Sequence, residues 1–214
     1  MGVGTRERIM EAARLTVQDL GYGGLSFREL AKEVGIKSAS IHYYFPTKGE
    51  LGVAIVSRYI EHYTLFLDGL LLDGRPGEDA DRSVLMRHYT DMFRSTLLNG
   101  NRLCLAGMLA AERNELPAEV RAEVVRWGEM NERWLARVLA DAEARSAQGE
   151  AGSERESASN TGPGAASRHP AAVPHRARAI FAAVSGAQMI AHGRNEVAIY
   201  DDAIAAYRAS GLIP

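Results

Sequence analysis

The sequence predicts an all-α protein, and three observations support that class. Apolar residues recur at helical spacing along most of the chain, and Gly and Pro residues stand where these stretches end. No alternation of apolar and polar residues long enough for a strand appears. The chain has 214 residues, of which 46% are hydrophobic. That is enough for one ordinary core, or for a small module joined to a larger one.

The first helix is expected over residues 5–20. Apolar side chains at Ile9, Ala13 and Leu20 fall on one face of this stretch. We expect Thr5 to cap the start of the helix and Gly21 to end it.

Two short helices are expected next. Ser26 and Glu29 have the spacing of a capping box, which places the start of the second helix at Ser26. Gly35 can take the left-handed backbone of a sharp turn, because it has no Cβ. A third helix then follows over residues 38–45, and Pro46 ends it.

The rest of the chain is also expected to be helical, apart from one segment. The remaining helices are expected over residues 47–72, 81–98, 103–112, 117–145, 177–192 and 196–209. Residues 146–175 are rich in Ser, Gly, Pro and Ala and poor in larger aliphatic side chains. Such a segment buries too little apolar surface to offset the entropy lost on ordering, so we expect a mobile surface loop there.

Composition limits the classes of function. The formal net charge is −2, so a nucleic-acid-binding surface would have to be local. The single cysteine, Cys104, excludes an intrachain disulfide and a zinc site built from cysteine pairs. No secretion signal, membrane span, hydrolase elbow, metalloprotease motif or phosphate-binding loop is found. We therefore expect a cytoplasmic protein that is not an enzyme and has no cofactor or metal.

Residues 26–51 have the layout of a helix-turn-helix. In such a motif the second helix enters the major groove of DNA and presents its early residues to the base edges. Ser38 and Ser40 offer short hydrogen-bonding groups there, and Ala39 offers a methyl group. An ordinary helical hairpin with a Ser-rich turn is the alternative reading of the spacing alone.

Other side chains of this region suit phosphates. The tyrosines have flat apolar rings with hydroxyl tips, and Lys48 stands at the start of the next helix, where the helix dipole favours an anion. The complete set of expected DNA contacts is Thr5, Arg6, Ser26, Lys37, Ser38, Ala39, Ser40, His42, Tyr43, Tyr44 and Lys48.

The run GIKSASIHYYFPTKGEL over residues 35–51 resembles the signature of TetR-type transcriptional regulators. The resemblance covers residues 5–51 and implies a DNA-binding domain over 1–47 and an effector-binding and dimerisation domain over 48–214. It further implies a homodimeric repressor that a small effector releases from a palindromic operator. His42 departs from the pattern, which usually has Tyr there, and a histidine could make operator affinity sensitive to pH.

The second half resembles the family only loosely. Residues 101–117 are similar to a branch that includes regulators of N-ethylmaleimide and other electrophile responses, in part of which a cysteine at this place is the sensor. Cys104 lies near an expected helix start and near Arg102, and both features would lower a thiol pKa. The alternative is that Cys104 is a small buried hydrophobic residue, as most free cysteines are.

A non-covalent effector, apolar or electrophilic, would need a pocket between helices. Aromatic and sulfur-bearing side chains suit such a ligand, although each is also an ordinary core residue. The candidates are Tyr63, Phe66, Met86, Tyr89, Phe93, Cys104, Met108, Trp127, Met130, Trp134 and Met189.

The last two expected helices are rich in Ala, which allows close helix packing. Phe181, Val184, Ala187 and Ala191 form one stripe, and Ile199, Ile204 and Tyr207 belong to another apolar surface. The resemblance implies that these helices pair with their copies in a four-helix dimer interface, while packing within one protomer is the alternative. The two DNA-binding domains of such a dimer would suit operator half-sites about 34–36 Å apart, or a multiple of that distance.

The sequence leaves two rival functions open beside a ligand-released repressor. One is a repressor that senses electrophiles through Cys104, and the other is a DNA-bound structural factor on the same scaffold.

Overall fold

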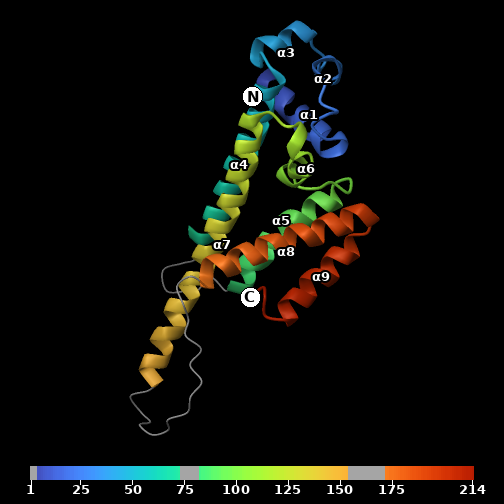
Figure 1. Cartoon of the computed structure of the whole chain (residues 1–214). Helices are drawn as coiled ribbons and strands as arrows, with labels where there is room; N and C mark the ends of the chain where they lie inside the picture. Colours follow the sequence, from blue (N-terminus) through green and yellow to red (C-terminus); the bar gives the residue numbers. More distant parts are fainter. Residues whose placement is uncertain (1–3, 73–81, 154–171) are drawn as a thin grey trace.

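The computed structural model describes residues 4–72, 82–153 and 172–214, with side chains described up to residue 140 in the middle range. The described residues form helices joined by short turns, without a strand (Figure 1). The elements are α1 (Thr5–Leu20), α2 (Phe27–Val34), α3 (Ser38–Tyr44), α4 (Lys48–Leu72), α5 (Arg82–Leu98), α6 (Leu105–Ala111), the 3₁₀ turn η1 (Arg113–Glu115), α7 (Ala118–Ser153), α8 (Ala172–Arg194) and α9 (Val197–Ala209). The predicted all-α class is confirmed.

The helices form a small N-terminal domain and a larger C-terminal one. Figure 1 shows α1, α2 and α3 gathered at one end, with α5, α8 and α9 at the other. The long helices α4 and α7 run side by side between the two ends. Close approach of these helices depends on Gly52, since a Cβ there would lie 2.8 Å from Cγ2 of Val120.

The turn between α2 and α3 is built as the sequence predicts. Gly35 has φ 73° and ψ 40°, in the left-handed region. Its N–H donates to the carbonyl of Lys32, and the N–H of Ile36 donates to the carbonyl of Ala31 at 2.9 Å. Backbone hydrogen bonds therefore close the last turn of α2. Glycine at position 35 adopts the required left-handed backbone without strain.

One predicted helix cap is wrong, and the other lacks its predicted side-chain hydrogen bonds. Gly4, not Thr5, occupies the cap position of α1, and its carbonyl accepts the N–H of Arg8. Ser26 does occupy the cap position of α2, but its hydroxyl makes no capping hydrogen bond. Glu29 pairs instead with Lys32, at 2.9 and 3.0 Å, so it does not reach back to complete the capping box.

The expected loop over residues 146–175 is too long at both ends. Helix α7 continues to Ser153 and α8 begins at Ala172, while the part of the loop over residues 154–171 lies outside the described residues. Ala, Gln, Glu and Arg dominate residues 142–151, and these residues favour helix, so α7 continues past the predicted end.

Candidate DNA-binding face and effector domain

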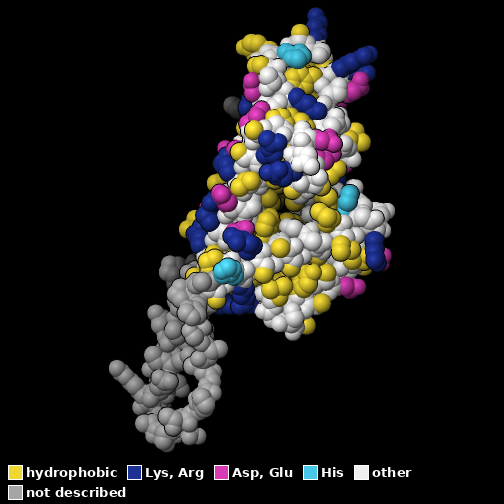
Figure 2. Space-filling model, viewed as in Figure 1, with side chains coloured by type: hydrophobic (Ala, Val, Ile, Leu, Met, Phe, Trp, Pro, Cys, Tyr) yellow, Lys and Arg dark blue, Asp and Glu magenta, His cyan; other side chains and the backbone are white. Residues whose placement is uncertain are grey.

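Helix α3 presents a polar face to solvent. Ser38, Ala39, His42 and Tyr43 are exposed, which is the pattern of one face of a helix, and Lys37 precedes them in extended backbone. Figure 2 shows Lys and Arg side chains projecting at this end of the molecule. Ser40 is only half-buried on the flank of this face.

The opposite face of α3 is anchored in the core. Ile41 and Phe45 are buried, and the ring of His42 lies edge-on to that of Phe27, with 4.9 Å between centroids. Burial of two large apolar side chains stabilises the position of so short a helix by about 3–6 kcal/mol. The exposed face is therefore held rigidly enough to read a surface.

The two tyrosines at the end of α3 differ in exposure. Tyr43 is 82% exposed and Tyr44 is 37% exposed, and their rings meet edge-on at 5.2 Å. Both side chains are thus open to solvent at the end of α3, where the sequence predicts phosphate contacts.

The remaining expected contacts surround α3 but are engaged within the protein. The guanidinium of Arg6 lies over the ring of Phe45, with 5.1 Å to the centroid. Thr5 and Ser26 are half-buried. Lys48 Nζ lies 4.5 Å from the centroid of the Tyr22 ring and 3.5 Å from the Gly23 carbonyl oxygen.

The surroundings of Lys48 also affect its charge. Desolvation by burial lowers the pKa of Lys48, and the carboxylates of Glu112 and Glu115 partly oppose that effect. These glutamates come from the larger domain, so Lys48 stands at the boundary between the two domains as well as near the DNA-binding face.

Three contacts that sequence reasoning missed join α1 to the segment around α6. Gln18 donates to the carbonyl of Leu103 at 2.7 Å, and Arg102 forms a two-pronged ion pair with Asp19 at 2.5 and 2.8 Å. At the end of α1 the N–H of Tyr22 donates to Glu112 at 2.5 Å. No local pattern could have revealed these pairs, because each joins residues more than eighty positions apart.

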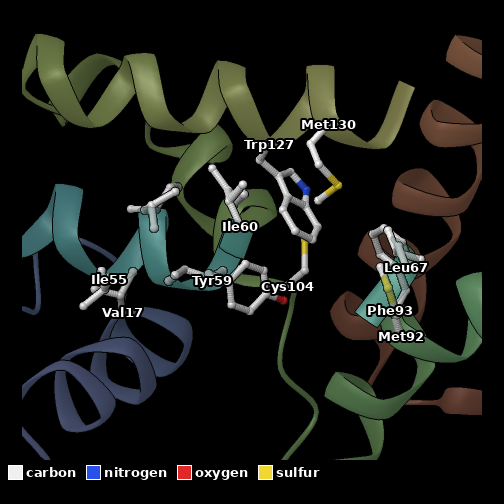
Figure 3. Packing of buried hydrophobic residues seen from close by; sticks show 14 of the residues in the cluster. Val17, Ile55, Tyr59, Ile60, Leu67, Met92, Phe93, Cys104, Trp127 and Met130 are labelled. Atoms are coloured by element: carbon white, nitrogen blue, oxygen red, sulfur yellow. The ribbon is translucent and has the colours of Figure 1, made fainter. Parts of the chain in front are cut away.

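The expected effector-pocket residues gather into two aromatic groups. Tyr63 and Trp127 meet at 5.6 Å, and both also contact Tyr59. Tyr89 stacks on Trp134, at 5.4 Å and an angle of 11°, and also contacts Phe93. The close-up in Figure 3 shows Tyr59, Cys104 and Trp127 together, with Met130 beside them.

Two of the other candidates lie at the surface. Phe66 is 40% exposed and Met189 is 50% exposed, whereas Met86 is buried and Met108 is half-buried. Periodicity alone could not show which face of α4 or α8 turns inward.

The expected lowering of the Cys104 pKa is wrong. Cys104 is 4% exposed, and burial raises the pKa of its thiol to about 11. The backbone N–H of Gly107 does donate to Sγ at 3.2 Å, but that bond opposes the burial effect only in part. Arg102 is turned to Asp19 and does not assist the thiol.

The described residues hold no cluster of three or more His, Cys, Asp or Glu side chains that could bind a metal ion. None of the described helices is long and apolar enough to cross a membrane.

Residues 9–55 match the family model described as "Bacterial regulatory proteins, tetR family". This stretch contains most of α1 and all of α2 and α3, with their exposed polar face. These residues form a DNA-binding domain of the TetR family.

Two bacterial regulators are similar in sequence to part of this chain. It is 38% identical over 68 residues to "Probable HTH-type transcriptional regulator YttP" of Bacillus subtilis, which covers 32% of this chain and 33% of that protein. It is 27% identical over 119 residues to "HTH-type transcriptional repressor NemR" of Escherichia coli, which covers 55% of this chain and 58% of that protein.

A crystal structure of a TetR transcriptional regulator from Legionella pneumophila has the same fold. Its TM-score is 0.80 at 22% identity, with 98% of this chain and 99% of that chain covered. The curated relatives are matched over only 33% to 62% of their own length. The shared fold thus extends over both domains, whereas these sequence matches cover only part of each relative.

The His42 departure from the TetR-family pattern lies on the exposed face of α3. Its imidazole contacts Phe27 and stays open to solvent. A hydrogen-bond donor is therefore present at this position, as it would be with the usual Tyr.

Proposed function

We propose that this protein is a DNA-binding transcriptional regulator that binds a palindromic operator as a homodimer and leaves it when a small effector binds. The observation that carries the proposal is the solvent-facing side of α3, where Ser38, Ala39, His42 and Tyr43 stand on a helix anchored by Ile41. A rigid helix that presents short polar groups, a methyl group and a phenol suits the major groove.

The test of DNA binding introduces one charge on that face. In Ala39→Glu, a carboxylate would stand where the helix approaches the phosphates, so we expect duplex affinity to fall by at least about tenfold. Ala140→Glu is the matched control, because Ala140 is also exposed and lies toward the far end of α7. Binding is measured by fluorescence anisotropy with operator fragments recovered from genomic DNA.

The outcomes separate three functions. A regulator should protect a short palindrome near a promoter, and one or more compounds should weaken that protection. A structural factor on the same scaffold would occupy many sites without a ligand response. If the parent retained no duplex at low ionic strength, the protein would not be a DNA reader.

We propose that the homodimer forms through α8 and α9, on a different face from the one expected. Val184, Ala187 and Ala191 are buried inside the protomer, so that predicted stripe is not free to pair. The sequence could not separate two apolar stripes on so Ala-rich a helix.

The face of α8 that is exposed to solvent carries apolar residues, some of them small. It carries Ala182 and Gly186, together with Met189 and Ile190, which are 50% and 55% exposed. Figure 2 shows hydrophobic side chains over the region of α8 and α9. A Cβ at Gly186 would meet open space, which leaves room for a helix of a partner protomer.

Ile190→Asp is expected to convert the dimer to monomers in sedimentation velocity, because a carboxylate would be buried in the interface. Val125→Asp is the control, since Val125 is similarly exposed, at 60%, on α7. A dimer that survives Ile190→Asp would place the interface elsewhere.

Operator release through Cys104 is not part of this proposal. At neutral pH a thiol with a pKa of about 11 is almost entirely protonated, and the protonated thiol is a poor nucleophile.

A further inference from the structure

A cavity of about 330 Å³ lies where the DNA-binding domain meets the effector domain. Its walls come from α1, α4 and α5, and the side chains that matter here are Met10, Arg14, Arg58, His62, Tyr63 and Asn99. We call it the junction cavity. Its volume is at the lower end of the range for small-molecule sites.

One wall of the junction cavity is aromatic and firmly supported. Tyr63 lines it, and the Tyr63 ring meets Tyr59 at 4.7 Å and Trp127 at 5.6 Å. Met10 and Ile55, both buried, add apolar surface. A flat apolar group could lie against this wall without displacing the core behind it.

Two guanidinium groups also line the cavity. Arg14 and Arg58 line it, against the single carboxylate of Glu11. Glu11 binds Arg14 at 2.5 and 3.1 Å, and Gln18 accepts a further bond from the same guanidinium. Arg14 is therefore held in place, and its pairing with Glu11 raises its pKa.

Arg58 is held by only one of its nitrogens. Nη1 bonds to the Glu7 carboxylate at 2.8 Å and to the Glu7 carbonyl at 3.4 Å. Within the part of the chain that the structure describes, neither Nε nor Nη2 of Arg58 has an acceptor. These two nitrogens form the side of a guanidinium that binds a carboxylate with two parallel hydrogen bonds.

Two further donors border the cavity. The His62 ring contacts the Tyr63 ring at 5.0 Å, and neither ring nitrogen has a hydrogen-bond partner among the described residues. Asn99 accepts from Arg102 through Oδ1 at 3.3 Å, and its Nδ2 has no acceptor among the same residues. The cavity thus offers several uncommitted donors beside one aromatic wall.

We infer that the junction cavity binds a compact aromatic carboxylate. The carboxylate of the ligand bonds to Nε and Nη2 of Arg58, and its ring lies against Tyr63. Glu7 stays on Nη1 of the same guanidinium, so the ligand adds a second carboxylate to the group that links α4 to α1 and weakens its attraction to Glu7. The consequence for DNA rests on the proposed function: loosening α1 against α4 changes how the α3 face is presented.

Binding is tested first on the full chain without DNA. Benzoate, phenylacetate and cinnamate are titrated by ligand-observed NMR and calorimetry, and each is compared with its neutral amide. We expect at least one acid to bind at least about tenfold more tightly than its amide, because only the acid makes the charge-assisted pair.

Variants locate the site. Arg58→Gln should weaken that acid by about tenfold or more. Asn99→Asp, which changes no volume, should weaken it as well by placing a second carboxylate in the cavity. Arg137→Gln is the matched control, since Arg137 is exposed and paired with Asp68 outside the junction cavity, and it should bind like the parent.

Two results would overturn the inference. The first is that each acid binds no more tightly than its amide, or that none binds up to 20 mM (roughly the limit of fragment affinity). The second is that the affinity for the acid is unchanged in both Arg58→Gln and Asn99→Asp. The proposed function fails separately, if the protein retains no duplex. A ligand that binds through Arg58 but leaves operator affinity unchanged would overturn the link between the cavity and release while leaving DNA binding intact.

Discussion

Replacing Glu112 tests how strongly the C-terminal domain is held against the DNA-binding domain. The Glu112 carboxylate accepts the partly buried N–H of Tyr22 at 2.5 Å. In Glu112→Ala that N–H loses its charged acceptor, which costs about 1.5–3 kcal/mol of unfolding free energy. For a chain of this size, 2 kcal/mol corresponds to about 4–8 °C in the melting temperature.

The local geometry shows that this contact requires glycine at position 21. A Cβ at Gly21 would lie 1.9 Å from Glu112 Oε1, so the carboxylate occupies space that only glycine leaves free. Gly21 also has φ 75°, in the region that favours glycine. Glu112→Gln keeps an acceptor oxygen of the same reach, and we expect it to recover most of the loss.

The assay is equilibrium urea unfolding followed by circular dichroism and by Trp fluorescence. Glu115→Ala is the matched control, because Glu115 is exposed in the 3₁₀ turn that follows Glu112 and its side chain makes no hydrogen bond among the described contacts. We expect that control to stay within about 0.5 kcal/mol of the parent. Equal stability of Glu112→Ala and Glu115→Ala would refute the reasoning.

Three further predictions concern Lys48 beside the DNA-binding face, the Cys104 thiol and the turn at Gly35. Lys48→Ala should weaken binding to all DNA sequences and reduce the slope of log affinity against log salt concentration by about 1. Anisotropy between 50 and 200 mM salt (roughly the range in which counterion release dominates) measures this slope. An unchanged slope would mean that Lys48 contacts Tyr22 but no phosphate. Between pH 9 and 11 the unfolded chain releases the Cys104 proton while the native chain keeps it. The unfolding free energy of the parent should therefore fall by about 2 kcal/mol by pH 10.5 through this group, and Cys104→Ser should not show this part of the loss. Gly35→Ala should destabilise by about 1 kcal/mol, because φ is 73° there, whereas Gly69→Ala inside α4 meets open space and should stabilise by about 0.5–1 kcal/mol in the same urea titration; effects of equal sign would contradict this account.

Local sequence signals predicted the helices and the exposed face of α3 well. Apolar spacing with Gly21, Gly35 and Pro46 set most boundaries to within two residues, because helix stops depend on nearby residues. The exposed face of α3 followed from the same periodicity, with Ile41 turned inward. Fold class and motif therefore follow from neighbouring residues alone.

Features that depend on distant parts of the chain could not be predicted in this way. The thiol pKa of Cys104 is the clearest case, since its neighbours in sequence suggested a lowered value and its burial in the fold raises it. The inward turn of Val184 and the outward turn of Met189 depend on which helices pack on α8. Such choices are made by tertiary contacts and not by periodicity.

The contacts between the two domains also join distant parts of the chain, and they bear on function. The bond from Tyr22 to Glu112 and the ion pair of Asp19 with Arg102 tie α1 to the α6 segment, while Arg58 ties α1 to α4 through Glu7. Helix α1 therefore receives restraints from two separate elements of the C-terminal domain. A ligand that released only one of them would tilt α1 about the other without unfolding it, because the core contacts of α1 would remain. A double-mutant cycle between Arg58→Gln and Glu112→Ala would measure this directly: a coupling energy above about 0.5 kcal/mol in operator affinity is expected if the two restraints act on one moving helix, and additivity would show that they act independently.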